Sequence, residues 1–143
     1  MKNTLRLIIV LLPVVALLAA CQAGTAAPQI GVEAQMNGKP YRVVTVDELQ
    51  SMLENKDFYM VNVQKPWEGS IPQTDLRLPY DEIGQSLETL PADKNSKLMI
   101  YCFTSGMSKI AVATLIEQGY TDIWMLDGGI IAWEQAGLTL EQR

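Results

Sequence analysis

The sequence predicts a single α/β domain in which a mainly parallel sheet is flanked by helices on both faces. Apolar, strand-like segments alternate with helix-like segments over residues 41–143. These roughly one hundred residues are enough for one hydrophobic core. Strands separated by helices favour parallel pairing, because each helix returns the chain to the same end of the sheet.

The strand and helix signals follow one another in a regular order. Runs of apolar residues between polar turns predict strands at 58–63, 76–78, 97–101 and 123–126. A capping box, Thr45-Val46-Asp47-Glu48, predicts the start of the first helix. Apolar residues at helical spacing predict further helices at 80–90, 107–118 and 130–135, and Gly119 is placed to end the second of these.

Residues 1–20 have the order of a bacterial lipoprotein signal peptide. A positively charged start precedes the uncharged run Leu7–Ala20, and Leu18-Ala19-Ala20-Cys21 resembles a lipoprotein cleavage site. A transmembrane anchor is the alternative, but the run is shorter than the roughly 20 residues that span a bilayer, and Pro13 interrupts it. We expect lipid on Cys21 and an extracytoplasmic location on a bacterial membrane, periplasmic in a Gram-negative cell.

The segment that follows the signal has a different composition from the rest of the chain. Residues 22–40 are rich in Ala, Gly, Gln and Pro and show no apolar periodicity. We therefore expect a flexible tether over residues 21–40 and a folded domain over residues 41–143.

Charge and residue usage exclude several classes of function. Loss of the signal removes Lys2 and Arg6, which changes the net charge from −5 to −7 and disfavours nucleic-acid partners. The absence of histidine excludes Ser-His-Asp and Cys-His catalysis and the commonest zinc ligand sets. With Cys21 lipidated, Cys102 has neither a disulfide partner nor a second thiolate with which to bind a metal. We expect no metal and no cofactor.

Cys102 stands between an apolar strand and a helix, in the segment Cys102-Phe103-Thr104-Ser105-Gly106-Met107-Ser108. The first helical turn has unpaired N–H groups and the positive end of the helix dipole, which both favour an anion such as a thiolate or a persulfide. Ligands of open α/β sheets bind beyond the carboxyl ends of the strands, where Cys102 falls. We therefore expect an accessible, reactive sulfur rather than an inert core cysteine.

Three stretches of the sequence resemble the rhodanese family of sulfurtransferases, and together they cover nearly all of residues 41–140. Tyr101-Cys102 and the short loop up to Ser108 resemble the active-site loop of the family. Gly119–Ile123, followed by Leu126–Trp133 with its Gly-Gly turn and Ala-Trp pair, is close to the closing signature. The third stretch is Val61-Asn62-Val63 followed by Pro66, Glu68, Gly69, Ile71 and Pro72.

The resemblance implies a rhodanese-like fold and a sulfur-transfer reaction. In the family, the cysteine thiolate takes the outer sulfur of a small donor such as thiosulfate and becomes a persulfide. A thiol or cyanide then accepts that sulfur, and the loop amides stabilise the persulfide without a metal. The residues so implicated are Cys102 as nucleophile and, for substrate binding, Phe103, Thr104, Ser105, Gly106, Met107, Ser108 and Lys109.

The sequence departs from the family at charged positions. Family members commonly have Asp and Arg where this chain has Asn62 and Gln64, and a histidine where it has Ser70. Phe103 and Met107 occupy loop positions that are often basic. Without a guanidinium to pair with a sulfonate we expect poor affinity for thiosulfate, and a thiol-bound or apolar donor fits this uncharged loop better.

Two alternatives follow from these departures. The first is a binding or thiol-sensing module that has the fold but has lost turnover. The second is phosphatase chemistry, because the cell-cycle tyrosine phosphatases share the fold. Those enzymes need an arginine at the sixth position after the cysteine, and Ser108 stands there, so a phosphate would lack its clamp.

Overall fold

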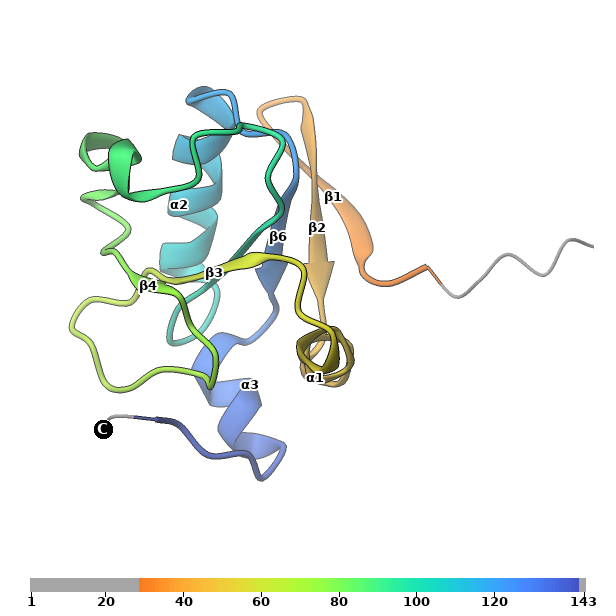
Figure 1. The fold of residues 1–143 in the computed structure, drawn as a ribbon. Coiled ribbons are helices and arrows are strands. Elements are labelled where there is room, and N and C mark those ends of the chain that lie inside the picture. The colour runs from red at the N-terminus through yellow and green to blue at the C-terminus, as the bar shows by residue number, and fades with distance from the viewer. Residues whose placement is uncertain (1–28, 142–143) are drawn as a thin grey trace, which may run out of the picture.

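The computed structural model describes residues 29–141, which form a six-stranded sheet with the order β1-β2-β6-β5-β3-β4 (Figure 1). The strands are β1 (Val32–Met36), β2 (Lys39–Val44), β3 (Tyr59–Asn62), β4 (Leu76–Arg77), β5 (Leu98–Tyr101) and β6 (Ile123–Leu126). The helices are α1 (Val46–Glu54), α2 (Gly106–Glu117) and α3 (Gly129–Gln135), with two short 3₁₀ turns, η1 (Ile83–Gln85) and η2 (Leu87–Thr89). Only β1 pairs antiparallel among these strands, so the expected mainly parallel sheet is confirmed.

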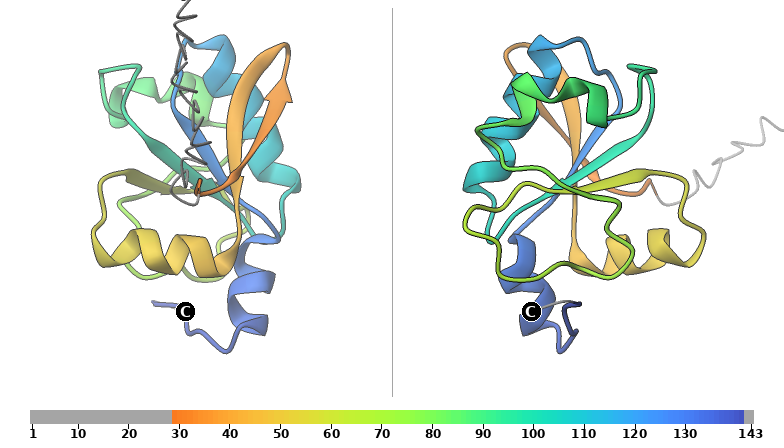
Figure 2. Two further views of the ribbon diagram at one scale, coloured as in Figure 1. Left: turned by 90° about the vertical axis from the view of Figure 1, so that its right-hand side faces the viewer. Right: turned by 60° about the vertical axis from the view of Figure 1, so that its left-hand side comes forward.

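Helices cover both faces of the sheet, as expected. Figure 2 shows α1 and α2 on opposite sides of the strands. Alternate residues of β5 therefore enter different cores: Leu98 and Ile100 pack in the cluster on the α2 face, and Met99 and Tyr101 in the cluster that includes α1 and α3. Burial on both faces explains why these central strands are continuous apolar runs.

The prediction of a tether as far as residue 40 is wrong. Val32–Met36 forms the edge strand β1, paired antiparallel with β2, and its register places Val32 opposite Val43. Asn37 and Gly38 both have positive φ, at 51° and 73°, and make the two-residue turn between the strands. An Asn-Gly pair is a strong hairpin signal, which the composition of residues 22–40 obscured.

The helix predicted at 80–90 is also wrong, because the structure has two short 3₁₀ turns there, η1 and η2. Ile83 and Leu90 are nevertheless buried, so the apolar spacing marked a packed segment correctly. Gly84 and Ser86 are weak helix formers, and a Cβ at Gly84 would lie 3.2 Å from Thr114 of α2. The segment therefore packs closely on α2 without a continuous helix.

The other elements that the sequence predicted lie within a residue or two of their predicted bounds, whereas β2, like β1, was not predicted. The capping box of α1 is present, with Thr45 Oγ1 accepting from the Glu48 amide at 3.3 Å. The predictions for residues 1–20 and for Cys21 fall outside the residues that the structure describes. Within 29–141, no helix is long and apolar enough to cross a bilayer.

Candidate active site

The carboxyl ends of the parallel strands bring the candidate residues to one edge of the sheet. Cys102 directly follows β5, between β3 and β6. The Val63 amide donates to the Tyr101 carbonyl at 2.8 Å, which holds the end of β3 beside the start of the cysteine loop, residues 102–108. The expected position beyond the sheet is therefore correct.

The sulfur of Cys102 is both buried and held by the main chain. The Ser108 amide donates to Cys102 Sγ at 3.4 Å, as expected for a sulfur at the N-terminus of α2. The whole residue is 0% exposed, however, so the expectation of an open sulfur is wrong. Met107 is half-buried and packs against the core cluster that contains Cys102.

The amides of the cysteine loop form a row of unused donors. The N–H groups of residues 103–107 donate to no acceptor among residues 29–141, and the Ser108 N–H donates to the sulfur. The first intrahelical bond of α2 runs from the Lys109 amide to the Ser105 carbonyl at 3.0 Å. Unpaired amides at a helix N-terminus are a binding site for an anion, so this part of the expectation agrees with the geometry.

The start of α3 sets the orientation of the loop. The amides of Ile130 and Ile131 donate to the carbonyls of Cys102 and Phe103 at 2.9 and 3.0 Å. The N–H of a trans peptide points away from its carbonyl, so the amides that follow these two carbonyls point away from α3. Gly129 permits this approach, because a Cβ there would lie 2.9 Å from the Phe103 carbonyl carbon and would overlap the carbonyl oxygens of Cys102 and Thr104.

Ser105 links the loop to the Gly-Gly turn. Its hydroxyl accepts from the Gly128 amide at 3.0 Å and lies 3.4 Å from an Asp127 carboxylate oxygen. Ser105 is the N-cap of α2, but its side chain makes no capping hydrogen bond. Asp127 therefore contacts the Ser105 hydroxyl that binds the Gly-Gly turn.

The other loop residues that the sequence implicated fall into two groups. Ser108 is 0% exposed, and its hydroxyl has no hydrogen-bond partner within residues 29–141. Thr104, Gly106 and Lys109 are exposed, and the Lys109 ammonium makes no ion pair with any residue that the structure describes. Ser108 faces the sulfur through its amide, whereas nothing in the contacts of Lys109 directs its charge towards Cys102.

A second loop, residues 64–70 and here called the rim loop, lies against the cysteine loop. Its Lys65 amide donates to Met107 Sδ at 3.4 Å. Asn62 holds the rim loop with neutral hydrogen bonds, donating to the Gly69 carbonyl at 2.9 Å and accepting from the Gln64 amide at 3.0 Å. Gln64 Oε1 is buried without a partner within 29–141. The uncharged polar residues that stand where the family commonly has charged ones thus still hold this loop in place.

Tyr101 supports the far end of the rim loop from inside the core. Its hydroxyl accepts from the Ile71 amide at 3.0 Å and lies 2.6 Å from Thr74 Oγ1. Thr74 donates to the Ile71 carbonyl, so Tyr101 is the donor in the second contact. Burial raises the pKa of the Tyr101 phenol, which therefore stays protonated and able to donate.

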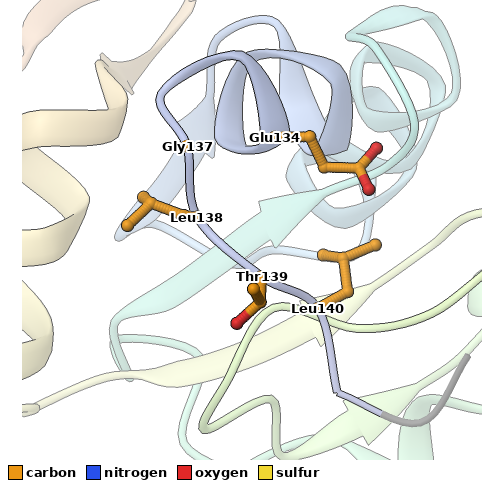
Figure 3. Close-up of a pocket in the computed structure, with 5 residues that line it drawn as sticks. All are labelled: Glu134, Gly137, Leu138, Thr139 and Leu140. Atoms are coloured by element: carbon orange, nitrogen blue, oxygen red, sulfur yellow. The ribbon is translucent and has the colours of Figure 1, made fainter.

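The C-terminal segment braces the same loop from outside. Ser70 and Glu141 exchange two backbone hydrogen bonds of 3.0 and 2.8 Å, and the Trp133 indole donates to the Thr139 carbonyl at 3.0 Å. Trp133 is buried. Beside this segment lies a hollow of about 440 Å³ (Figure 3), whose lining residues come from α3 and the C-terminal segment and not from the cysteine loop: Glu134, Gly137, Leu138, Thr139 and Leu140.

Sequence reasoning did not include Lys65 and Arg77 among the site residues. Lys65 lies on the rim loop, and its ammonium pairs with Asp81 and Glu82 at 2.9 and 3.2 Å. Arg77 ends β4 and stacks on Trp67. Arg77 is in register with Asn62 and Tyr101, so its side chain lies on the sheet face opposite to that of Cys102. No group of three or more His, Cys, Asp or Glu side chains that could hold a metal occurs in the described part of the chain.

Comparison with known proteins identifies the family. The model of the rhodanese-like domain matches residues 45–136. The chain belongs to the rhodanese-like family. A sulfurtransferase from Allochromatium vinosum is 35% identical over 94 residues, which cover 64% of this chain and 85% of the relative. The thiosulfate sulfurtransferase GlpE of Vibrio cholerae is 26% identical over 100 residues, which cover 68% of this chain and 92% of that protein.

Solved rhodanese-like structures agree with this assignment. A rhodanese-like domain protein from Staphylococcus aureus is 32% identical, with a TM-score of 0.58 over 70% of this chain and 98% of that one. A rhodanese-related protein from Thermoplasma volcanium is 25% identical, with a TM-score of 0.59 over 70% and 97%. The rhodanese-like fold is therefore confirmed, and the family to which the chain belongs is one of sulfurtransferases.

Proposed function

We propose that the domain is a sulfurtransferase or persulfide carrier in which Cys102 is the nucleophile. The observation that carries the proposal is the row of unpaired amides over residues 103–107, next to a sulfur that already accepts from Ser108. The buried Ser108 hydroxyl, which lacks a partner within 29–141, adds a polar group that a bound anion would satisfy. These groups suit a thiolate, a persulfide or the oxyanion of a donor.

The proposed reaction moves one sulfur atom in two displacements. The Cys102 thiolate attacks the outer sulfur of the donor, a new S–S bond forms, and the donor leaves as sulfite or as a thiolate. A thiol or cyanide then attacks the outer sulfur, which breaks that S–S bond and returns the Cys102 thiolate. No external oxidant is needed, because the sulfur is transferred at the zero-valent level in both steps.

The donor class follows from the charges around the loop. The relative GlpE is named a thiosulfate sulfurtransferase, so thiosulfate is the first donor to test here. The cysteine loop itself carries no cation, since Phe103 and Met107 stand at its often basic positions. A sulfonate would be held by amides alone, so we propose weak use of thiosulfate and better use of a thiol-bound sulfur.

We propose further that the domain is held on the extracytoplasmic side of a membrane by lipid on Cys21. The support is the order of residues 1–21: a basic start, an apolar run too short to span, and small residues before the cysteine. Such an anchor would leave the domain in water beside the membrane.

A second candidate is a thiol-binding or sensing module without turnover. The complete burial of Cys102 favours it, because a donor must displace side chains before it can reach the sulfur. In this case the thiol would exchange with a donor once, and no acceptor would turn it over.

The decisive experiment is intact mass spectrometry of the full-length protein after incubation with thiosulfate, with mercaptopyruvate and with a low-molecular-weight persulfide. We expect a gain equal to one sulfur atom, which disappears in Cys102→Ser and is removed by cyanide. Alkylation of Cys102 in the folded protein, measured first, shows that the thiol can be reached. An alkylatable Cys102 that gains no sulfur from any donor contradicts both candidates, and sulfur that is gained but never released to an acceptor supports the second.

A further inference from the structure

The strand β1 presents a free edge at one side of the sheet (Figure 1). Within residues 29–141 it pairs with β2 alone, and the strand at the opposite edge, β4, is only two residues long. β1 has five residues and contains no lysine, no proline and no bulge, which are features that commonly protect an exposed edge from pairing. The outer side of β1 is therefore open to a further strand.

The register of the β1–β2 hairpin shows which backbone groups of β1 point outwards. The two-residue turn makes Met36 and Lys39 a hydrogen-bonded pair, and such pairs alternate with non-bonded pairs along an antiparallel ladder. Glu33 and Gln35 therefore direct their N–H and C=O groups away from β2. Pro40 stands opposite Gln35 and has no N–H, which agrees with this assignment. The outward groups of Glu33 and Gln35 have no partner in the described part of the chain.

The side chains of β1 divide between the two faces of the sheet. Ala34 and Met36 pack against the core cluster on the α2 face. Val32 points to the same face, because residues two apart in a strand share a side, yet it is 73% exposed. Val32 is the most exposed large apolar side chain among residues 29–141. The edge thus carries a row of apolar side chains of which one end has no cover.

We propose that β1 pairs antiparallel with β1 of a second copy of this chain, about a two-fold axis that passes between the two Ala34 residues. Outward groups must meet outward groups, so Glu33 of one copy pairs with Gln35 of the other, and Ala34 faces Ala34. This register forms four N–H···O=C hydrogen bonds between the copies. It also places the exposed Val32 opposite Met36 of the second copy, which joins the two apolar rows into one.

Charge selects this register over its neighbour. Glu33 is the only charged residue of β1, and the register centred on Ala34 sets it opposite the neutral Gln35 of the other copy. A register centred on Glu33 also satisfies the outward backbone groups, but it would place two carboxylates directly opposite each other. Like charges in such a pair destabilise a sheet, so the strand is complementary to itself in one register.

The segment that leads into β1 is held away from this edge. The Gly31 amide donates to Glu48 of α1 at 2.8 Å, and the Ile30 carbonyl accepts from Arg42 of β2 at 3.1 Å. These contacts direct the chain before β1 towards α1 and β2, and not back along the free side of β1. A second copy is therefore a better occupant of the edge than the preceding residues of the same chain.

The pairing is expected to be weak by itself. One pair of five-residue strands is a small interface beside the roughly 1,000 Å² that a stable complex buries, so the dimer should depend on concentration. A lipid anchor on Cys21, as proposed above, would raise that concentration at a membrane.

Disulfide trapping tests the register in the full-length protein, in the cell fraction that contains it. The two Ala34 Cα atoms would lie about 4.5 Å apart across the axis, which suits a disulfide. Ala34→Cys should therefore give a product of twice the mass on a non-reducing gel after mild oxidation. Gln35→Cys is the matched control on the same strand, because its two Cα atoms would lie about 8 Å apart, too far for a bridge. Wild type reports any disulfide through Cys21 or Cys102 and should give no dimer.

Two further variants separate pairing from chance collision. Gln35→Pro, added to Ala34→Cys, removes an outward N–H without loss of a bond to β2, so it should abolish the dimer and leave the circular dichroism spectrum unchanged. Chains with Val32→Cys and chains with Met36→Cys, oxidised together, should form a mixed dimer although neither dimerises alone. This second pair tests the same register if residue 34 does not tolerate cysteine.

The inference is overturned if neither Ala34→Cys nor the mixed chains give a dimer, or if Gln35→Cys cross-links as strongly as Ala34→Cys. A product of any other mass would show a different protein at this edge and would overturn it too. None of these variants alters the cysteine loop, so loading of Cys102 with sulfur tests the proposed function separately.

Discussion

Replacement of Gly129 by alanine should destabilise the protein by more than the positive φ of residue 129 alone would, because the new Cβ meets the backbone of the cysteine loop. Gly129 has φ of +55°, and a Cβ there would overlap the carbonyl oxygens of Cys102 and Thr104 and lie 2.9 Å from the Phe103 carbonyl carbon. All three atoms belong to backbone, which cannot yield as a flexible side chain does. A left-handed alanine costs about 1–2 kcal/mol, and the overpacking adds about 1–3 kcal/mol.

The matched control is Gly137→Ala at the end of α3. Gly137 also has positive φ, +80°, but a Cβ there meets nothing within 4 Å. Urea unfolding followed by circular dichroism should therefore show a loss of about 1–2 kcal/mol for Gly137→Ala and about 2–5 kcal/mol for Gly129→Ala. The rate of Cys102 alkylation in native buffer should change only in Gly129→Ala, because only that variant forces the cysteine loop to shift.

Equal losses of stability in the two variants would refute this reasoning. They would mean that the cysteine loop moves away from α3 at no cost, so that the hydrogen bonds from Ile130 and Ile131 do not hold its carbonyls. An unaltered alkylation rate in Gly129→Ala would refute the link between the Gly-Gly turn and the sulfur. In that case the turn would serve the core alone.

Two further predictions concern the rest of the chain. Glu48 accepts from the amides of Thr45 and Gly31, both at 2.8 Å, and these hydrogen bonds lower the pKa of its carboxyl. The contribution of Glu48 to stability is complete above its unfolded pKa and is lost as the pH falls through the lower folded value. The difference in stability between wild type and Glu48→Gln, measured by urea unfolding, should therefore shrink below about pH 4.3. A difference that widens there would contradict this prediction. Cys21→Ala should move the full-length protein from the membrane fraction and abolish the mass of attached lipid; unchanged fractionation and mass would exclude lipidation at Cys21.

Much of the fold followed from patterns that act over a few residues. The capping box at Thr45 and the apolar runs of the central strands depend on local hydrogen bonding and on burial of both faces, so they could be predicted. The hairpin that adds β1 was missed although Asn37-Gly38 signals it, because the composition around it was given more weight. The 3₁₀ turns at η1 and η2 could not be foreseen, since packing on α2 selects them over a helix.

The sequence by itself determined where the proposed chemistry would lie: a cysteine at a strand-to-helix junction, and a Gly-Gly turn spaced to meet it. Only the tertiary structure decided how that site is built. The burial of Cys102, the carbonyls held by α3 and the hydrogen bond from the Lys65 amide to Met107 join residues from separate strands and loops. The physical reason is that exposure, amide direction and charge pairing depend on neighbours in space, which a pattern along one segment does not contain.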